Sequence, residues 1–120
     1  MQRDSKTSQP EGVGASVARE VLDEVVRRIV ETVHPRRIIL FGSAARGAMS
    51  RDSDLDLLVV MPDGTHRRNA ATEVFRALRG IGLPKDVVVV TEGDVRDYRY
   101  NPSLVLKPAF EDGIALYVAA

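Results

Sequence analysis

The strongest constraint on how this chain can fold lies between residues 38 and 60, where the sequence reads IILFGSAARGAMSRDSDLDLLVV. A short apolar run ends at Gly42-Ser43, further small residues follow, and a second apolar run begins with Asp54 and Asp56. This order predicts a strand, a loop and an acidic strand. A small-residue loop beside clustered carboxylates is typical of a site that binds phosphate and metal.

The two carboxylates of the acidic strand are predicted to act together. Residues two apart in a strand lie on the same face, about 6.5 to 7 Å apart, so Asp54 and Asp56 point the same way. Like charges held together destabilise each other unless a cation lies between them. Mg²⁺ is the expected cation, because it prefers oxygen ligands and is commonly bound by one or two carboxylates together with nucleotide phosphates.

A third carboxylate, Asp86, begins another apolar run that ends at Thr91. If the two acidic strands are neighbours, Asp86 joins Asp54 and Asp56, and three carboxylates can hold two divalent ions about 3.5 to 4 Å apart. That geometry activates an attacking oxygen and neutralises a leaving phosphate. The competing interpretation is that each aspartate only begins its strand as a solvated terminus.

The loop supplies candidate groups for binding phosphate. Gly42 lets the backbone approach a phosphate closely, and Ser43 offers it a hydroxyl and an N–H. Arg46 is either a further phosphate ligand or the exposed partner of a salt bridge. His34 and His66 have no second ligand at metal-binding spacing, so we expect surface or capping roles for them.

Composition narrows the remaining functions. Seventeen acidic and seventeen basic residues balance, so direct nucleic-acid binding and binding to anionic lipid are not expected. The chain has no cysteine, which excludes thiolate chemistry and is compatible with a reducing cytosol. No apolar run approaches the roughly 18 residues that span a bilayer, and the first residues are polar. We therefore expect a soluble, cytoplasmic protein with no membrane contact.

The remaining sequence predicts one domain built around these strands. Residues 1–14 have almost nothing to bury and are expected to form a disordered tail, which leaves residues 15–120 for the domain. Helices are predicted from Ser16 to just before Pro35, from His66 to Arg79 and from Ser103 to Asp112. Strands are predicted over Arg37–Phe41, Asp54–Val60, Val87–Thr91 and Ile114–Val118, with an irregular segment or short helix over Glu92–Tyr100.

The connections between these elements favour a small mixed sheet. The link from residue 41 to residue 54 suits antiparallel neighbours, whereas the link from residue 58 to residue 87 is long enough for a helical crossover. With helices flanking the strands, the predicted fold class is α/β of the α+β kind, with a mixed and mostly antiparallel sheet.

The motif as a whole resembles a known signature. Gly42-Ser43, ten residues and then Asp54-x-Asp56 reproduce the pattern GSx10DxD, with Arg46-Gly47 and Ser53 placed as in its usual GSxxRG and SDxDL form. Over about residues 16 to 118 the chain resembles the minimal nucleotidyltransferases, the MNT type, of the DNA polymerase beta superfamily.

This resemblance implies a palm-like fold, with ATP or another nucleoside triphosphate as substrate. It implies that Asp54 and Asp56 bind Mg²⁺, and that Asp86 assists and activates the acceptor hydroxyl. It also implies that Gly42 and Ser43 hold the triphosphate. Attack of the hydroxyl on the α-phosphate would release pyrophosphate, with two metal ions stabilising the charge.

The acceptor is less constrained than the chemistry. Small members of this type resemble the antitoxin half of HEPN/MNT pairs, in which AMP is transferred to a tyrosine of the HEPN ribonuclease toxin. The shortness of the chain favours this interpretation, because it leaves no room for a separate acceptor-binding domain. Two alternatives stay open: a small-molecule nucleotidyltransferase similar to the aminoglycoside-modifying enzymes, and a non-catalytic antitoxin that neutralises by contact. The motif does not specify which nucleotide base is preferred or whether the chain forms a homo-oligomer.

Overall fold

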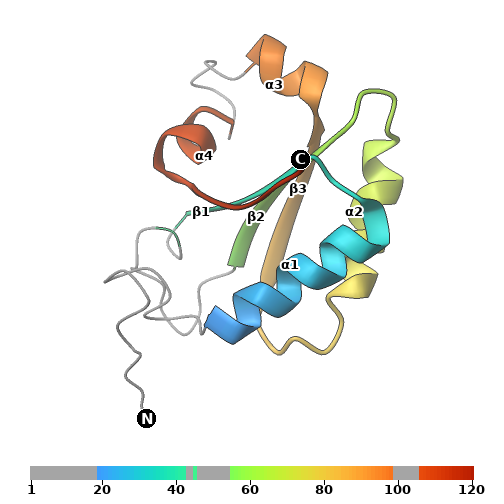
Figure 1. Cartoon of the computed structure of the whole chain (residues 1–120), viewed down its shortest axis with the longest axis vertical. Coiled ribbons are helices and arrows are strands. Elements are labelled where there is room, and N and C mark those ends of the chain that lie inside the picture. The colour runs from blue at the N-terminus through green and yellow to red at the C-terminus, as the bar shows by residue number, and fades with distance from the viewer. Residues whose placement is uncertain (1–18, 43–44, 46–54, 99–105) are drawn as a thin grey trace.

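The computed structural model of the chain describes residues 19–42, 45, 55–98 and 106–120, and a four-stranded sheet runs through this part (Figure 1). In chain order the elements are α1 (Arg19–Val33), β1 (Arg37–Phe41), β2 (Leu55–Met61), α2 (Arg67–Ala77), β3 (Lys85–Thr91), α3 (Glu92–Tyr98), α4 (Leu106–Asp112) and β4 (Ile114–Val118). The predicted tail, the predicted helix cap Ser16 and the first residues of the last predicted helix lie outside the described residues.

The strands follow the order β3-β2-β1-β4. β1 pairs with β2 and with β4 in antiparallel fashion, whereas β2 and β3 are parallel. Helix α2 makes the crossover between the two parallel strands, as the length of that link predicted. The predicted mixed, mostly antiparallel sheet flanked by helices is therefore confirmed.

Helices cover both faces of the sheet (Figure 1). Alternate residues of β2 point to opposite faces, so the strand contributes to two hydrophobic clusters. The larger cluster joins β2 to α1 and α2 and includes Leu22, Val25, Ile29, Leu55, Leu57, Val59, Val74 and Leu78. The smaller cluster joins the other face to α4 and consists of Ile39, Leu58, Val60, Val90, Leu106 and Ala109. Six of the seven residues of β2 are buried, and the exception is Asp56.

The helix ends are fixed by local contacts. His66 precedes α2, and its side chain accepts a hydrogen bond from the backbone N–H of Asn69, which confirms the capping role expected for it. Thr91 and Asp94 form a reciprocal pair of hydrogen bonds that begins α3, the short helix foreseen for this segment. Pro108 lies in the first turn of α4, where its missing N–H costs no helical hydrogen bond.

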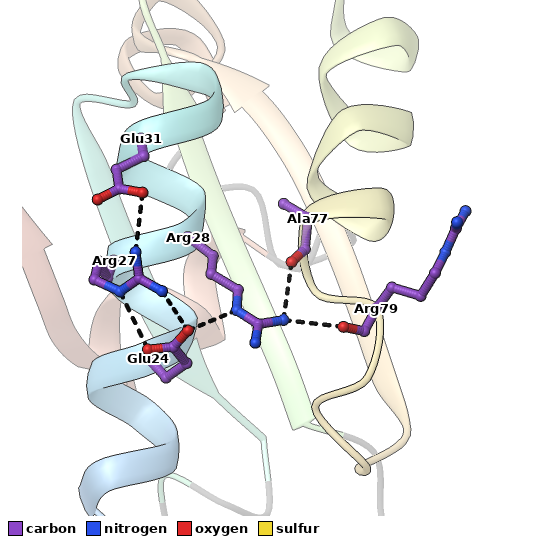
Figure 2. A network of polar contacts seen from close by, with 6 residues as sticks. All are labelled: Glu24, Arg27, Arg28, Glu31, Ala77 and Arg79. Atoms are coloured by element: carbon purple, nitrogen blue, oxygen red, sulfur yellow. Dashed lines mark hydrogen bonds and ion pairs between the residues drawn. The ribbon is translucent and has the colours of Figure 1, made fainter.

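Helices α1 and α2 are joined by Arg28 (Figure 2). Its Nη1 donates to the backbone oxygens of Ala77 at 3.2 Å and Arg79 at 2.9 Å, and its Nε donates to Glu24 Oε2 at 2.7 Å. The last carbonyl groups of a helix have no partner within the helix. Arg28 therefore satisfies carbonyl groups at and just beyond the end of α2 from a neighbouring helix.

Replacing Arg28 by alanine is expected to lower the free energy of unfolding by about 1 to 2 kcal/mol, because the two carbonyl groups lose a charged donor. Urea unfolding followed by circular dichroism measures the loss. The matched control is Arg27→Ala, since the hydrogen bonds of Arg27 to described residues, Glu24 and Glu31, stay within α1. Arg27→Ala should lower the free energy of unfolding clearly less than Arg28→Ala does. Equal losses in the two variants would show that Arg28 does not join the helices.

The same network makes stability depend on pH. Hydrogen bonds from Arg27 and then Arg28 lower the pKa of Glu24 from 4.5 to about 2. Because the pKa is lower in the folded state, the stabilisation is complete above about pH 4.5 and is lost as the pH falls toward 2. The stability difference between the wild type and Glu24→Gln should therefore shrink through this range. A difference that stays constant in urea titrations across the range would contradict this account.

Candidate functional site

Two of the three predicted carboxylates become neighbours in the sheet. The parallel register of β2 and β3 pairs Asp56 with Asp86, and the antiparallel register of β1 and β2 pairs Phe41 with Asp56. Adjacent strands lie about 4.8 Å apart, so the backbones that carry the two carboxylates are close. Asp56 is partly buried and Asp86 is exposed. The fold thus meets the condition under which Asp86 joins the acidic strand.

Both aspartates lie on the same face of the sheet. Asp56 alternates with Leu57, so it shares its face with Leu58 and Val60, which pack in the smaller cluster. Asp86 likewise shares its face with Val88 and Val90, which belong to or contact that cluster. The carboxylates lie where these two strands begin, and Asp56 lies beside Gly42 at the end of β1.

The loop begins with a close contact to Asp56. Gly42 follows the last residue of β1 and has φ +74°, a backbone conformation that residues other than glycine rarely adopt. Its Cα lies against the Asp56 side chain, so that a methyl group added there would overlap Asp56 Oδ2. The backbone of the loop therefore begins directly beside the partly buried carboxylate.

The other predicted site residues lie outside the described residues. These are Asp54, Ser43 and Arg46, and the helical turn expected after Ser43 falls there as well except for Ala45. Their roles in binding metal and phosphate stay predictions. Within the described ranges, no three His, Cys, Asp or Glu side chains gather into a metal-binding group.

The described carboxylates fit a hard cation. Asp56 and Asp86 offer only oxygen ligands, from adjacent positions of a rigid sheet, and oxygen ligands are those that Mg²⁺ prefers. Asp94 is a different kind of carboxylate. The backbone N–H of Thr91 lowers the pKa of Asp94, with a further contribution from Arg67, and this group fixes the start of α3.

Two surface hollows lie at the opposite end of β2. One, of about 530 Å³, is lined by Thr65, His66, Arg67 and Arg68. The other, of about 210 Å³, is lined by Arg37, Val60, Glu92, Val95 and Arg96. Asp56 lies near the start of β2, whereas Val60 lies near its end and Thr65 follows it. Among the described residues, the candidate carboxylates line neither hollow.

Sequence reasoning missed the contact between Gly42 and Asp56. It assigned Gly42 to phosphate and Asp56 to metal, as separate functions of the loop and the strand. The contact depends on the register that pairs Phe41 with Asp56, and no spacing in the sequence specifies that register.

None of the helices in the described ranges combines the length and the apolar character that a membrane-spanning helix requires.

Comparison with known proteins identifies a family. Residues 19–114 match the family described as nucleotidyltransferase domain. A structure from Sulfolobus solfataricus, provisionally assigned as a nucleotidyltransferase, superimposes with a TM-score of 0.57 at 22% identity, covering 92% of this chain and 91% of that one. A structure described as a toxin-antitoxin with AMP-PNP gives a TM-score of 0.52 at 22% identity, over 82% of this chain and 73% of that one. At these identities, the structures show a shared fold. No curated protein sequence matches the chain.

Proposed function

Because the chain belongs to the nucleotidyltransferase domain family, we propose that it transfers AMP from ATP to a hydroxyl group. The proposed acceptor is a tyrosine of a HEPN-type toxin, and the chain acts as the antitoxin. The observation that carries the proposal is the in-register pairing of Asp56 and Asp86 beside the loop that begins at Gly42. Two adjacent carboxylates next to a glycine of positive φ suit the binding of a metal-bound triphosphate.

Three residues would hold the metal ions in this proposal. Asp56 and Asp86 lie side by side on one face of the sheet, and Asp54 precedes β2 by one residue. When bound, Mg²⁺ neutralises charge on the phosphates and favours loss of the proton from the acceptor hydroxyl. Gly42 and Ser43 would bring backbone N–H groups and a hydroxyl to the triphosphate.

The proposed reaction is a displacement at the α-phosphate. The acceptor oxygen forms a bond to that phosphorus while the bond to the bridging oxygen of the β-phosphate breaks, and pyrophosphate leaves. Asp86 is exposed and lies on the edge strand of the sheet, so an acceptor can approach it from solvent. In this proposal Asp86 accepts the hydroxyl proton, while Asp56, partly buried and held between two strands, keeps its place as a metal ligand.

Two observations are compatible with a partner protein as the acceptor. Of the two hollows described above, neither is lined by Asp56 or Asp86. The fold shared with a chain from a toxin-antitoxin structure is consistent with the antitoxin role. A partner that presents its own tyrosine would bring the acceptor hydroxyl to the exposed Asp86.

The test uses two forms of labelled ATP with the purified chain, Mg²⁺ and a HEPN-type protein as the proposed acceptor. Label at the α-phosphate should appear on the partner, whereas label at the γ-phosphate should not, because pyrophosphate leaves. The double variant Asp54→Ala with Asp56→Ala should give no labelled partner. Label from the γ-phosphate would reject nucleotidyl transfer, and labelling that persists in the double variant would reject the assigned site.

Two further outcomes separate the competing activities. AMP transfer to an aminoglycoside without any protein partner would replace the proposed acceptor by a small molecule. Protection of cells by the triple variant Asp54→Ala, Asp56→Ala and Asp86→Ala, at wild-type expression, would show that contact neutralises the toxin. In either case the antitoxin proposal in its catalytic form is rejected.

A further inference from the structure

Gly42 and the side chain of Asp56 are in close contact. A methyl group on the Cα of Gly42 would overlap Asp56 Oδ2 and would lie 3.1 Å from Asp56 Cγ and 3.4 Å from Asp56 Cβ. The Asp56 side chain therefore lies along the side of Gly42 that a side chain would occupy. This contact follows from the sheet, because the residue before Gly42 is paired with Asp56.

Other glycines of the chain show that backbone conformation alone does not produce this contact. Gly64, Gly80 and Gly82 also have positive φ, at +91°, +87° and +91°, and a methyl group on any of them would meet nothing within 4 Å. Gly42 alone among these four combines positive φ with a carboxylate at its Cα. The chain thus supplies matched controls for the two effects of substituting Gly42.

We infer that Gly42 is a positioning residue for Asp56: the space left by its missing side chain sets where the Asp56 carboxylate lies. The inference rests on the proposed function, since it treats Asp56 as a metal ligand. Any larger residue must displace the carboxylate or the strand end, and Mg²⁺ tolerates little departure from octahedral geometry at about 2.0 to 2.1 Å. Gly42 then acts on metal binding through Asp56, apart from any contact of its own with phosphate.

The first test measures the contact itself and needs no activity. Thermal unfolding is compared for Gly42→Ala and for Gly64→Ala, which shares the positive φ but has open space. Gly42→Ala should lower the melting temperature more than Gly64→Ala does. In the Asp56→Ala background, which removes the opposing carboxylate, the loss from Gly42→Ala should fall to that of the control.

This double-mutant cycle decides whether Gly42 and the Asp56 carboxylate are in contact. An equal loss from Gly42→Ala in both backgrounds would mean that only backbone strain is measured, and it would overturn the inference. If Gly42→Ala does not fold alone, recovery of the folded state in the Asp56→Ala background supports the contact. Failure to recover would count against it.

The second test measures the affinity for Mn²⁺, a spectroscopic substitute for Mg²⁺, from the electron paramagnetic resonance signal of the free ion. Gly42→Ala should weaken Mn²⁺ binding about tenfold or more, as loss of a group that orients a ligand does, and Gly64→Ala should not. Combining Gly42→Ala with Asp56→Asn should weaken binding no more than Asp56→Asn does, because one residue acts through the other.

Asp56→Asn alone separates failure of the inference from failure of the proposed function. If Asp56→Asn weakens Mn²⁺ binding but Gly42→Ala leaves it at the wild-type value, the inference is wrong and the metal site stands. If Asp56→Asn also leaves the affinity unchanged, the proposed metal site is rejected, and the inference is rejected with it.

Discussion

Replacing Asp56 by asparagine is expected to reduce AMP transfer about 10²- to 10³-fold. The neutral amide lacks the negative charge with which the carboxylate would hold the metal ions. Asparagine has nearly the same shape, so it keeps the register with Phe41 and Asp86 and the contact with Gly42. The initial rate of adenylate transfer at saturating Mg²⁺ measures the effect. Circular dichroism of the same sample verifies the fold.

A surface carboxylate provides the control for this prediction. Asp97 is exposed near the end of α3, and its Oδ1 lies 3.8 Å from Arg96 Nε in a solvent-facing ion pair. Asp97→Asn removes the same charge at a distance from the sheet end that carries the site, so transfer should stay near the wild-type rate. Equal losses in both variants would indicate a general effect of net charge, and Asp56 would lose its assigned role.

Replacing Leu57 by alanine is expected to cost about 3 kcal/mol of unfolding free energy, within the range found for buried leucines. Leu57 follows Asp56 in β2 but points to the opposite face, where it is fully buried in the larger cluster with α1 and α2. The deletion leaves a cavity between the sheet and both helices. For a small domain this is a large share of the total stability, and urea unfolding measures it.

Val118 is the matched comparison for this loss. It is an aliphatic residue of the edge strand β4, but it is 62% exposed. Val118→Ala should change the free energy of unfolding by less than about 0.5 kcal/mol. If Leu57→Ala costs as little, the central strand is not the packing centre that the structure indicates.

Much of the fold could be predicted from the sequence, because hydrophobic periodicity and helix-breaking residues are local features. The apolar run of β2 and the four valines of β3 predicted strands, and Pro35 marked the end of the first helix. Link lengths then separated the antiparallel pair from the parallel pair, as the structure confirms. Boundaries shifted by one or two residues, with β3 beginning at Lys85 rather than at Val87.

For the candidate site, the sequence proposed residues but did not specify how they contact one another. Spacing placed Asp54 and Asp56 on one strand and made Asp86 a candidate third ligand. The pairing of Asp86 with Asp56 in particular depends on the register of β2 and β3, which packing against both faces of the sheet selects. The contact with Gly42 depends in addition on where β1 ends. Such tertiary geometry has no counterpart in a local pattern.

The network at Arg28 shows the same limit in a structural contact. The alternation of charged residues along α1 predicted only an exposed face. Arg28 instead donates to backbone oxygens of Ala77 and Arg79, which are about fifty residues away in the chain, as Figure 2 shows. A charged residue on an amphipathic helix can satisfy the end of another helix, and only the packing of α1 against α2 reveals which one does.

The most direct test of the central claim is the intact mass of the proposed HEPN-type partner after incubation with ATP, Mg²⁺ and the chain. The partner should gain the mass of one adenylate group with the wild type. Over the same incubation time, nearly all of the partner should keep its original mass with Asp56→Asn, which transfers AMP far more slowly, or when Mg²⁺ is removed by a chelator. A partner that gains the mass of a phosphate group, or that gains adenylate equally with Asp56→Asn, would contradict the account.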